Sequence, residues 1–197
     1  FSRMGQAEHI QHNRIGGGHR HRIAKLEIPN IQHCFEWTME HGEAELSGLL
    51  GLATSELIRN SGPFEGVTAM LRRAHKTLPN DVPLRARLLL EQGRLASNRE
   101  GLEVAERLLR DAIALADTLD IPFVASQSRV YLAYILARTR RLDVALAMAQ
   151  DAVEKAAASD KREHLPSAQY CRGYLTQQSG ETRKALPDLQ SALRGFQ

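Results

Sequence analysis

Small residues recur along this chain in three columns that share one spacing. The first column holds Ser55, Gly93, Ala133 and Gly173, the second holds Val67, Ala105, Ala145 and Ala185, and the third holds Ala74, Ala112, Ala152 and Ala192. The steps within every column are 38, 40 and 40 residues. Because helices that cross closely need small side chains at the crossing, a period of this length predicts a stack of two-helix units.

The period predicts an all-α fold, an α-α superhelix of about four helix pairs preceded by one N-terminal helix. We expect nine helices and no strand, with the helices at residues 29–42, 45–59, 64–78, 84–97, 102–118, 123–138, 142–158, 166–178 and 182–196. Gly and Pro residues between these ranges suit helix ends and helix starts. The repeats then span approximately residues 48–81, 86–120, 126–160 and 166–197, within a domain of residues 26–197.

The first 25 residues differ in composition from the rest of the chain. They contain a run of three glycines, four of the eight histidines, and five basic residues against Glu8 alone, with no sustained helical period. We therefore expect a flexible basic lead-in. Since the net charge of +3 is concentrated there, residues 26–197 are nearly neutral, which argues against nucleic-acid binding by the repeats.

Two cysteines, Cys34 and Cys171, lie far apart in predicted helices and have no metal-ligand spacing around them. We expect both to be reduced thiols in the core. No apolar run approaches the roughly 20 residues that span a bilayer, so a cytoplasmic location without membrane contact is expected. The chain begins with Phe and has no secretory signal pattern, which favours a trimmed chain or a segment of a longer protein.

A more specific pattern accompanies the columns. In the first repeat it consists of Gly62, Phe64, Val67, Leu71, Ala74 and Pro79. This order of small, aromatic and large apolar residues before a final Pro resembles the tetratricopeptide repeat (TPR). The step near 40 residues exceeds the usual TPR length of roughly 34 residues. Longer repeats of this kind resemble those of large bacterial signalling regulators.

Residues 26–46 also resemble the stretch that opens the repeat region of such regulators, with Asn30, Ile31 and Trp37 at matching places. These are the STAND-type transcription regulators of the MalT, LuxR and AfsR kinds. The resemblance implies a non-catalytic sensor or interaction module of a larger bacterial regulator, which binds a protein or peptide, with a small-molecule inducer as a further ligand class. The alternative is a free-standing TPR scaffold that assembles a protein complex, and self-association stays open for both.

In TPR arrays, the first helix of each pair lines a concave groove, and the resemblance implies that its non-packing side chains meet the ligand. The register of the columns selects Arg87, Arg94, Gln127, Tyr134, Tyr170, Tyr174 and Gln177 for this partner-binding groove. Arg138 joins them because it forms a basic cluster with Arg140 and Arg141. Arg and Tyr are frequent hot-spot residues. The alternatives are that the tyrosines fill space between repeats and that the arginines lie in a solvated turn.

Catalytic motifs are missing from the sequence, including the Gly-x-x-x-x-Gly-Lys-Ser/Thr loop of the ATPase in a complete regulator. No acid, base or nucleophile constellation can be placed in one pocket, so we expect no enzyme, no cofactor and no metal site. His9, His12, His19 and His21 could gather a divalent metal. A solvated tail is the favoured interpretation, because nothing would orient the four rings.

Overall fold

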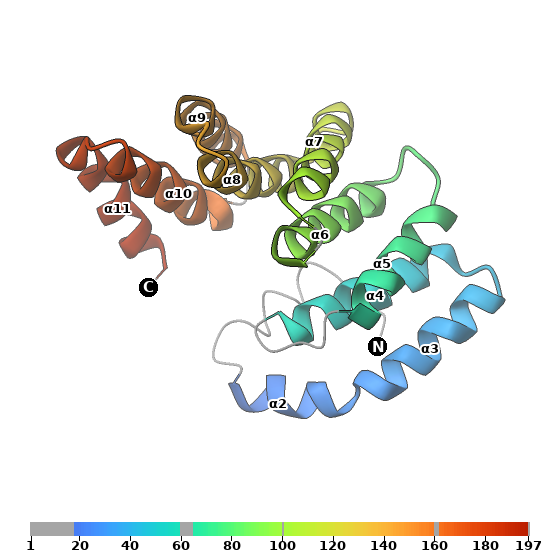
Figure 1. Ribbon diagram of the computed structural model, residues 1–197. Helices are drawn as coiled ribbons and strands as arrows, with labels where there is room; N and C mark the ends of the chain where they lie inside the picture. Colours follow the sequence, from blue (N-terminus) through green and yellow to red (C-terminus); the bar gives the residue numbers. More distant parts are fainter. Residues whose placement is uncertain (1–17, 60–64, 100, 160–161, 197) are drawn as a thin grey trace. The chain divides into compact units, whose positions relative to one another are not determined.

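The computed structural model describes residues 18–59, 65–99, 101–159 and 162–196. Within these ranges the chain is all-helical, which confirms the predicted fold class (Figure 1). The helices are α2 (Gly18–Leu26), α3 (Ile28–Glu40), α4 (Ala44–Ile58), α5 (Glu65–Thr77), α6 (Pro83–Arg99), α7 (Leu102–Thr118), α8 (Pro122–Arg138), α9 (Leu142–Ala158), the 3-10 turn η2 (Arg162–His164), α10 (Leu165–Gln178) and α11 (Thr182–Gly195).

Each of the nine expected helices lies within two residues of its predicted bounds, and α7 and α9 match at both ends. Helix α2 is the exception, because the sequence analysis expected no helix before residue 29. Its sequence has no sustained apolar stripe, and the helix forms where Ala24 packs against the core of the following helices. The proposed histidine cluster falls on side chains outside the part of the chain that the structure describes.

The chain divides into two compact units, residues 1–95 and 96–197. In the first unit, α4 packs between α3 and α5, and every residue from Ser47 to Ile58 is buried. Ile31 and Phe35 of α3 are fully buried against this helix. A helix that is apolar on all sides needs such enclosure, so α4 forms the centre of this unit.

The second unit repeats one packing scheme, in which α8 contacts α7, α9 and α10, while α10 contacts α9 and α11. The column residues of these helices are buried, as the period predicted. At Gly173 of α10, an added Cβ would lie 2.9 Å from Cγ of Leu189 in α11. That spacing is too short for a real side-chain contact, so the small-residue column marks the helix crossing.

The turns inside the two pairs of the second unit have the same hydrogen bonds. Arg140 N–H donates to Ala137 O at 3.0 Å, and one repeat later Gly180 N–H donates to Gln177 O at 3.0 Å. Both residues have positive φ, 61° at Arg140 and 91° at Gly180. Glycine adopts this conformation readily, whereas an L side chain raises its energy. The third repeat therefore carries local backbone strain that the fourth avoids.

Across the described ranges, no helix has both the length and the apolar character required to cross a membrane.

Candidate functional site

A group of three tyrosines lies on the neighbouring first helices α8 and α10. The ring centroid of Tyr134 lies 6.1 Å from that of Tyr174, and Tyr170 lies 6.3 Å from Tyr174 in a stacked arrangement. Tyr170 is 46% exposed and Tyr174 is 38% exposed, while Tyr134 is half-buried. We call these three residues the tyrosine face. The structure thus brings together three predicted groove residues from two repeats.

Two buried or half-buried groups at the tyrosine face, the Cys171 thiol and the Tyr134 hydroxyl, are neutral at neutral pH. Burial raises the pKa of the Cys171 thiol to about 12 and raises the pKa of the Tyr134 hydroxyl well above its ordinary value. The Cys171 thiol lies 3.8 Å from the carbonyl oxygen of Val130. Because a nucleophilic cysteine needs a lowered pKa, this thiol is a core residue, in agreement with the sequence analysis. The chemistry of the face is that of aromatic contact and neutral hydrogen bonding.

The other predicted groove residues of the second unit lie at different depths. Gln177 is exposed near the end of α10, and Gln127 of α8 is half-buried. The side-chain amide nitrogen of Gln127 is buried and has no hydrogen-bond partner in the structure. Arg138 is exposed and donates a hydrogen bond of 3.3 Å to the carbonyl oxygen of Ser97.

The basic cluster around Arg138 is partly engaged inside the protein. The Arg141 guanidinium forms an ion pair with Glu106 of α7 and a hydrogen bond of 3.0 Å to Thr139. Glu106 also accepts a hydrogen bond of 2.8 Å from Arg110. Arg141 therefore links α9 to α7, which weakens the interpretation of the three arginines as one open acidic-partner site.

Arg94 is buried, although its register position predicts a side chain that faces the groove. It is only 7% exposed, and its Nε donates to Glu91 at 2.7 Å while its Nη2 donates to Ser55 at 3.0 Å. Ser55 in turn donates to Glu91 at 3.0 Å. Burial by itself would raise the pKa of Glu91, but Arg94, Arg59 and these hydrogen bonds outweigh it and lower the pKa to about 2.

This buried network joins α4 to α6, and the sequence analysis missed it. The distance in sequence between Ser55 and Glu91 hides the contact, although Glu91 and Arg94 have the i, i+3 spacing of a helical ion pair. Ser55 is the polar member of the first small-residue column, and this feature of the sequence could have indicated a buried polar network. The structure corrects Arg94 from a groove contact to a packing residue.

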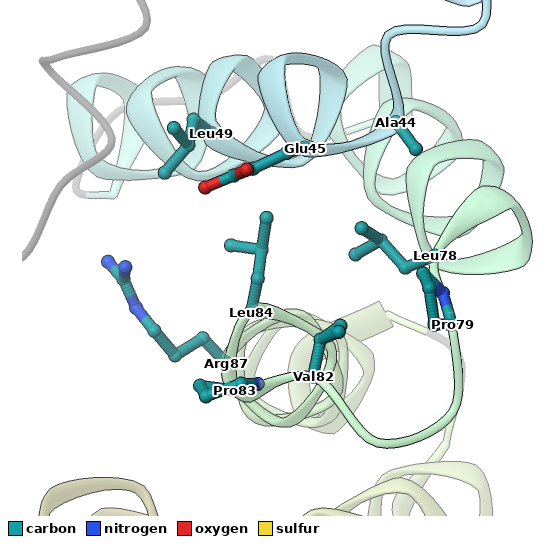
Figure 2. Close-up of a pocket in the computed structure, with 9 residues that line it drawn as sticks. All are labelled: Ala44, Glu45, Leu49, Leu78, Pro79, Val82, Pro83, Leu84 and Arg87. Carbon is teal, nitrogen blue, oxygen red and sulfur yellow. The ribbon is translucent and has the colours of Figure 1, made fainter.

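Arg87, the remaining predicted residue, is half-buried and lines a pocket of about 590 Å³ in the first unit. The pocket lies where the start of α4, the end of α5 and the start of α6 meet (Figure 2). Its lining residues are Ala44, Glu45, Leu49, Leu78, Pro79, Val82, Pro83, Leu84 and Arg87. Within the described residues, no group of three or more His, Cys, Asp or Glu side chains is placed to hold a metal ion.

Comparison with known protein families finds no family whose pattern matches this chain. Comparison with curated proteins likewise finds no matching sequence.

Solved structures do match. BtubC (BKLC) from P. vanneervenii has a TM-score of 0.72 at 14% identity, over 98% of this chain and 81% of that chain. MamA has a TM-score of 0.63 at 15% identity, over 92% and 94% of the two chains. The TPR-like repeats of a putative kinesin light chain from Podospora anserina have a TM-score of 0.61 at 16% identity, over 96% and 97%. The chain therefore has a TPR-like fold, as the sequence predicted.

Proposed function

We propose that the chain is a non-catalytic module that binds a protein or peptide segment through the tyrosine face of α8 and α10. The observation that carries the proposal is the exposure of Tyr170 and Tyr174 beside Tyr134, on two helices that share one register. Tyrosine offers a large contact area at low conformational-entropy cost and a hydroxyl for hydrogen bonding. Such residues carry much of the binding energy at protein interfaces.

The protonation of Cys171 and Tyr134 favours binding over catalysis at this face. Neither Cys171 nor Tyr134 ionises near neutral pH, because burial raises both pKa values. A peptide that crosses α8 and α10 would bury its side chains between the rings and extend toward Gln177, which is exposed near the end of α10. Backbone amides of an extended peptide suit the tyrosine hydroxyls and the amide group of Gln177.

A peptide-library selection tests this surface. Peptides enriched on the whole protein are measured by fluorescence anisotropy against the Tyr170→Ala/Tyr174→Ala variant and against Val144→Ala, which alters an exposed apolar residue of α9. We expect the double tyrosine variant to weaken binding by roughly tenfold or more, and the Val144 variant to leave it unchanged. Equal binding to all three proteins would show that the tyrosines are not the contact surface.

We further propose that the module belongs to a larger cytoplasmic bacterial transcription regulator. The support is the resemblance of residues 26–46 to the opening stretch of regulator repeats and the step near 40 residues. The coding sequence beside this segment tests it, since a regulator would encode an ATP-binding switch and a winged helix there. Their absence would favour the free-standing scaffold.

A further inference from the structure

The pocket of the first unit has the volume of a small-molecule site and a mostly apolar lining. Its volume of about 590 Å³ falls within the roughly 300–1,000 Å³ of typical ligand pockets. Leu49 and Leu78 are buried in its wall, and Val82 and Leu84 are half-buried. Such a lining accepts an apolar group of several carbon atoms, and its charged side chains are those of Glu45 and Arg87.

The two charged groups, Glu45 of α4 and Arg87 of α6, have opposite sign. Figure 2 shows the Glu45 carboxylate and the Arg87 guanidinium on one side of Leu84, with Leu78, Pro79 and Val82 on the other. Glu45 is exposed, while Arg87 is half-buried. The pocket therefore has an apolar end and a polar end that carries both a negative and a positive group.

The same register position in the second unit is filled by the protein itself. Two repeats after Glu45 and Leu84, the chain has Phe123 at the start of α8 and His164 before α10. Their ring centroids are 4.1 Å apart, and both side chains are half-buried. The repeat geometry thus accommodates ring-sized groups between successive first helices. In the first unit Leu84 packs against Gly48 of α4 instead, where an added Cβ would lie 2.7 Å from a Leu84 methyl carbon, and neither Glu45 nor Leu84 supplies a ring.

We propose that this pocket binds a free α-amino acid with a large apolar side chain. The side chain lies between α4 and α6 against Leu78, Val82 and Leu84. The ammonium group faces Glu45 and the carboxylate faces Arg87. Charge-assisted hydrogen bonds to both groups would give the pocket selectivity for a zwitterion over singly charged analogues. This site is separate from the tyrosine face and does not depend on it.

Titration calorimetry with a matched set of ligands tests the proposal. L-phenylalanine and L-leucine carry the ammonium group, the carboxylate and the apolar side chain. 3-Phenylpropionate lacks the ammonium group, and 2-phenylethylamine lacks the carboxylate. We expect saturable binding of the amino acids and a loss of roughly tenfold or more for each analogue. Absence of saturable amino-acid binding, or equal binding of the three phenyl compounds, would overturn the proposal.

Protein variants locate the ligand within the pocket. Arg87→Gln should weaken phenylalanine binding by roughly tenfold and leave 2-phenylethylamine unaffected, while Glu45→Gln should weaken phenylalanine and leave 3-phenylpropionate unaffected. Lys76→Gln, at an exposed residue of α5 outside the pocket lining, is the charge-matched control and should change nothing. If both pocket variants bind all ligands as the wild type does, the pocket is not the site.

A filling variant provides an independent check. Glu45→Phe/Leu84→His transfers the ring pair of α8 and α10 to the first unit and should abolish amino-acid binding while the protein still unfolds cooperatively. The Tyr170→Ala/Tyr174→Ala variant should keep full amino-acid affinity. Retained binding in the filling variant would contradict the proposal. A loss in the tyrosine variant would do so as well, and both outcomes are independent of peptide binding at the tyrosine face.

Discussion

Single residues inside the first unit show how burial changes the role of a charge. Glu91 accepts hydrogen bonds from Arg94 and Ser55, and Arg59 lies 3.4 Å from its other carboxylate oxygen. Glu56 pairs with Arg59 at 2.6 Å, and the Arg87 guanidinium also interacts electrostatically with Glu91. A buried ion pair that loses one partner leaves an uncompensated charge, so this network fixes the contact between α4 and α6.

We predict that Glu91→Gln lowers the free energy of unfolding by about 3 kcal/mol at pH 7, because buried arginines lose their carboxylate partner. The folded pKa of about 2 lies below the ordinary 4.5. The stabilisation is therefore complete above about pH 4.5 and is lost as the pH falls toward 2. Urea unfolding of wild type and variant between pH 7 and pH 3 measures this convergence.

The control for this prediction is Glu36→Gln, which removes the exposed ion pair between Glu36 and Arg73. An exposed pair contributes less than about 1 kcal/mol. If Glu91→Gln costs no more than Glu36→Gln at pH 7, the buried network does not stabilise the fold.

At the scale of helices and turns, the residue with positive φ in each turn of the second unit determines how much backbone strain the turn carries. Arg140 has a φ of 61° where the next repeat has a glycine. We predict that Arg140→Gly stabilises the protein by about 0.5–1 kcal/mol, since glycine reaches this conformation without steric conflict. Chemical denaturation measures the change. Arg140→Ala, which keeps the Cβ and removes the rest of the side chain, should not raise the free energy of unfolding in this way. If it raises stability as much as Arg140→Gly, the gain comes from loss of the side chain and not from relief of backbone strain.

Helix crossings at the small-residue columns leave little room for larger groups. Gly173→Val in α10 should destabilise the protein by about 1–3 kcal/mol, because its Cβ would meet Leu189. Combining it with Leu189→Ala should recover part of the loss, which a double-mutant cycle of unfolding free energies measures. Strict additivity of the two substitutions would show that they do not share this contact.

At the scale of the molecule, the last helix has an exposed apolar stripe. Leu193 is 63% exposed and Phe196 is 61% exposed, whereas the residues one repeat earlier, Val153 and Ala156, are half-buried and buried. Val153 and Ala156 belong to α9, which packs against the next repeat through α10. The exposed side of α11 therefore has the apolar character of a packing surface.

We predict that Leu193→Gln/Phe196→Gln reduces concentration-dependent self-association, because it removes exposed apolar surface. Light scattering over a concentration series compares the mean mass of wild type and variant. Leu26→Gln, at an exposed residue at the end of α2, is the control. Should the Leu193/Phe196 variant associate as much as the wild type, the stripe plays no part in assembly.

The sequence by itself determined nine of the ten α-helices that the structure describes. Helix bounds follow from local periodicity and from Gly and Pro at the turns, and the columns follow from the helix crossings, so both are visible in one dimension. The columns also place Tyr134 and Tyr174 at equivalent positions, and the structure brings their rings together, while their role in binding a partner stays a prediction. These features depend on the spacing of residues within one repeat or on its repetition.

Only the tertiary structure decided what each polar side chain does. Arg94 and Tyr174 have the same register position, yet Arg94 is buried with Glu91 while Tyr174 is exposed. Helix α2 forms because of packing that its own sequence does not show. The pocket at Arg87 depends on side chains from α4, from α6 and from the loop between α5 and α6. The burial of these side chains depends on contacts between residues far apart in the chain, which the register within a repeat does not specify.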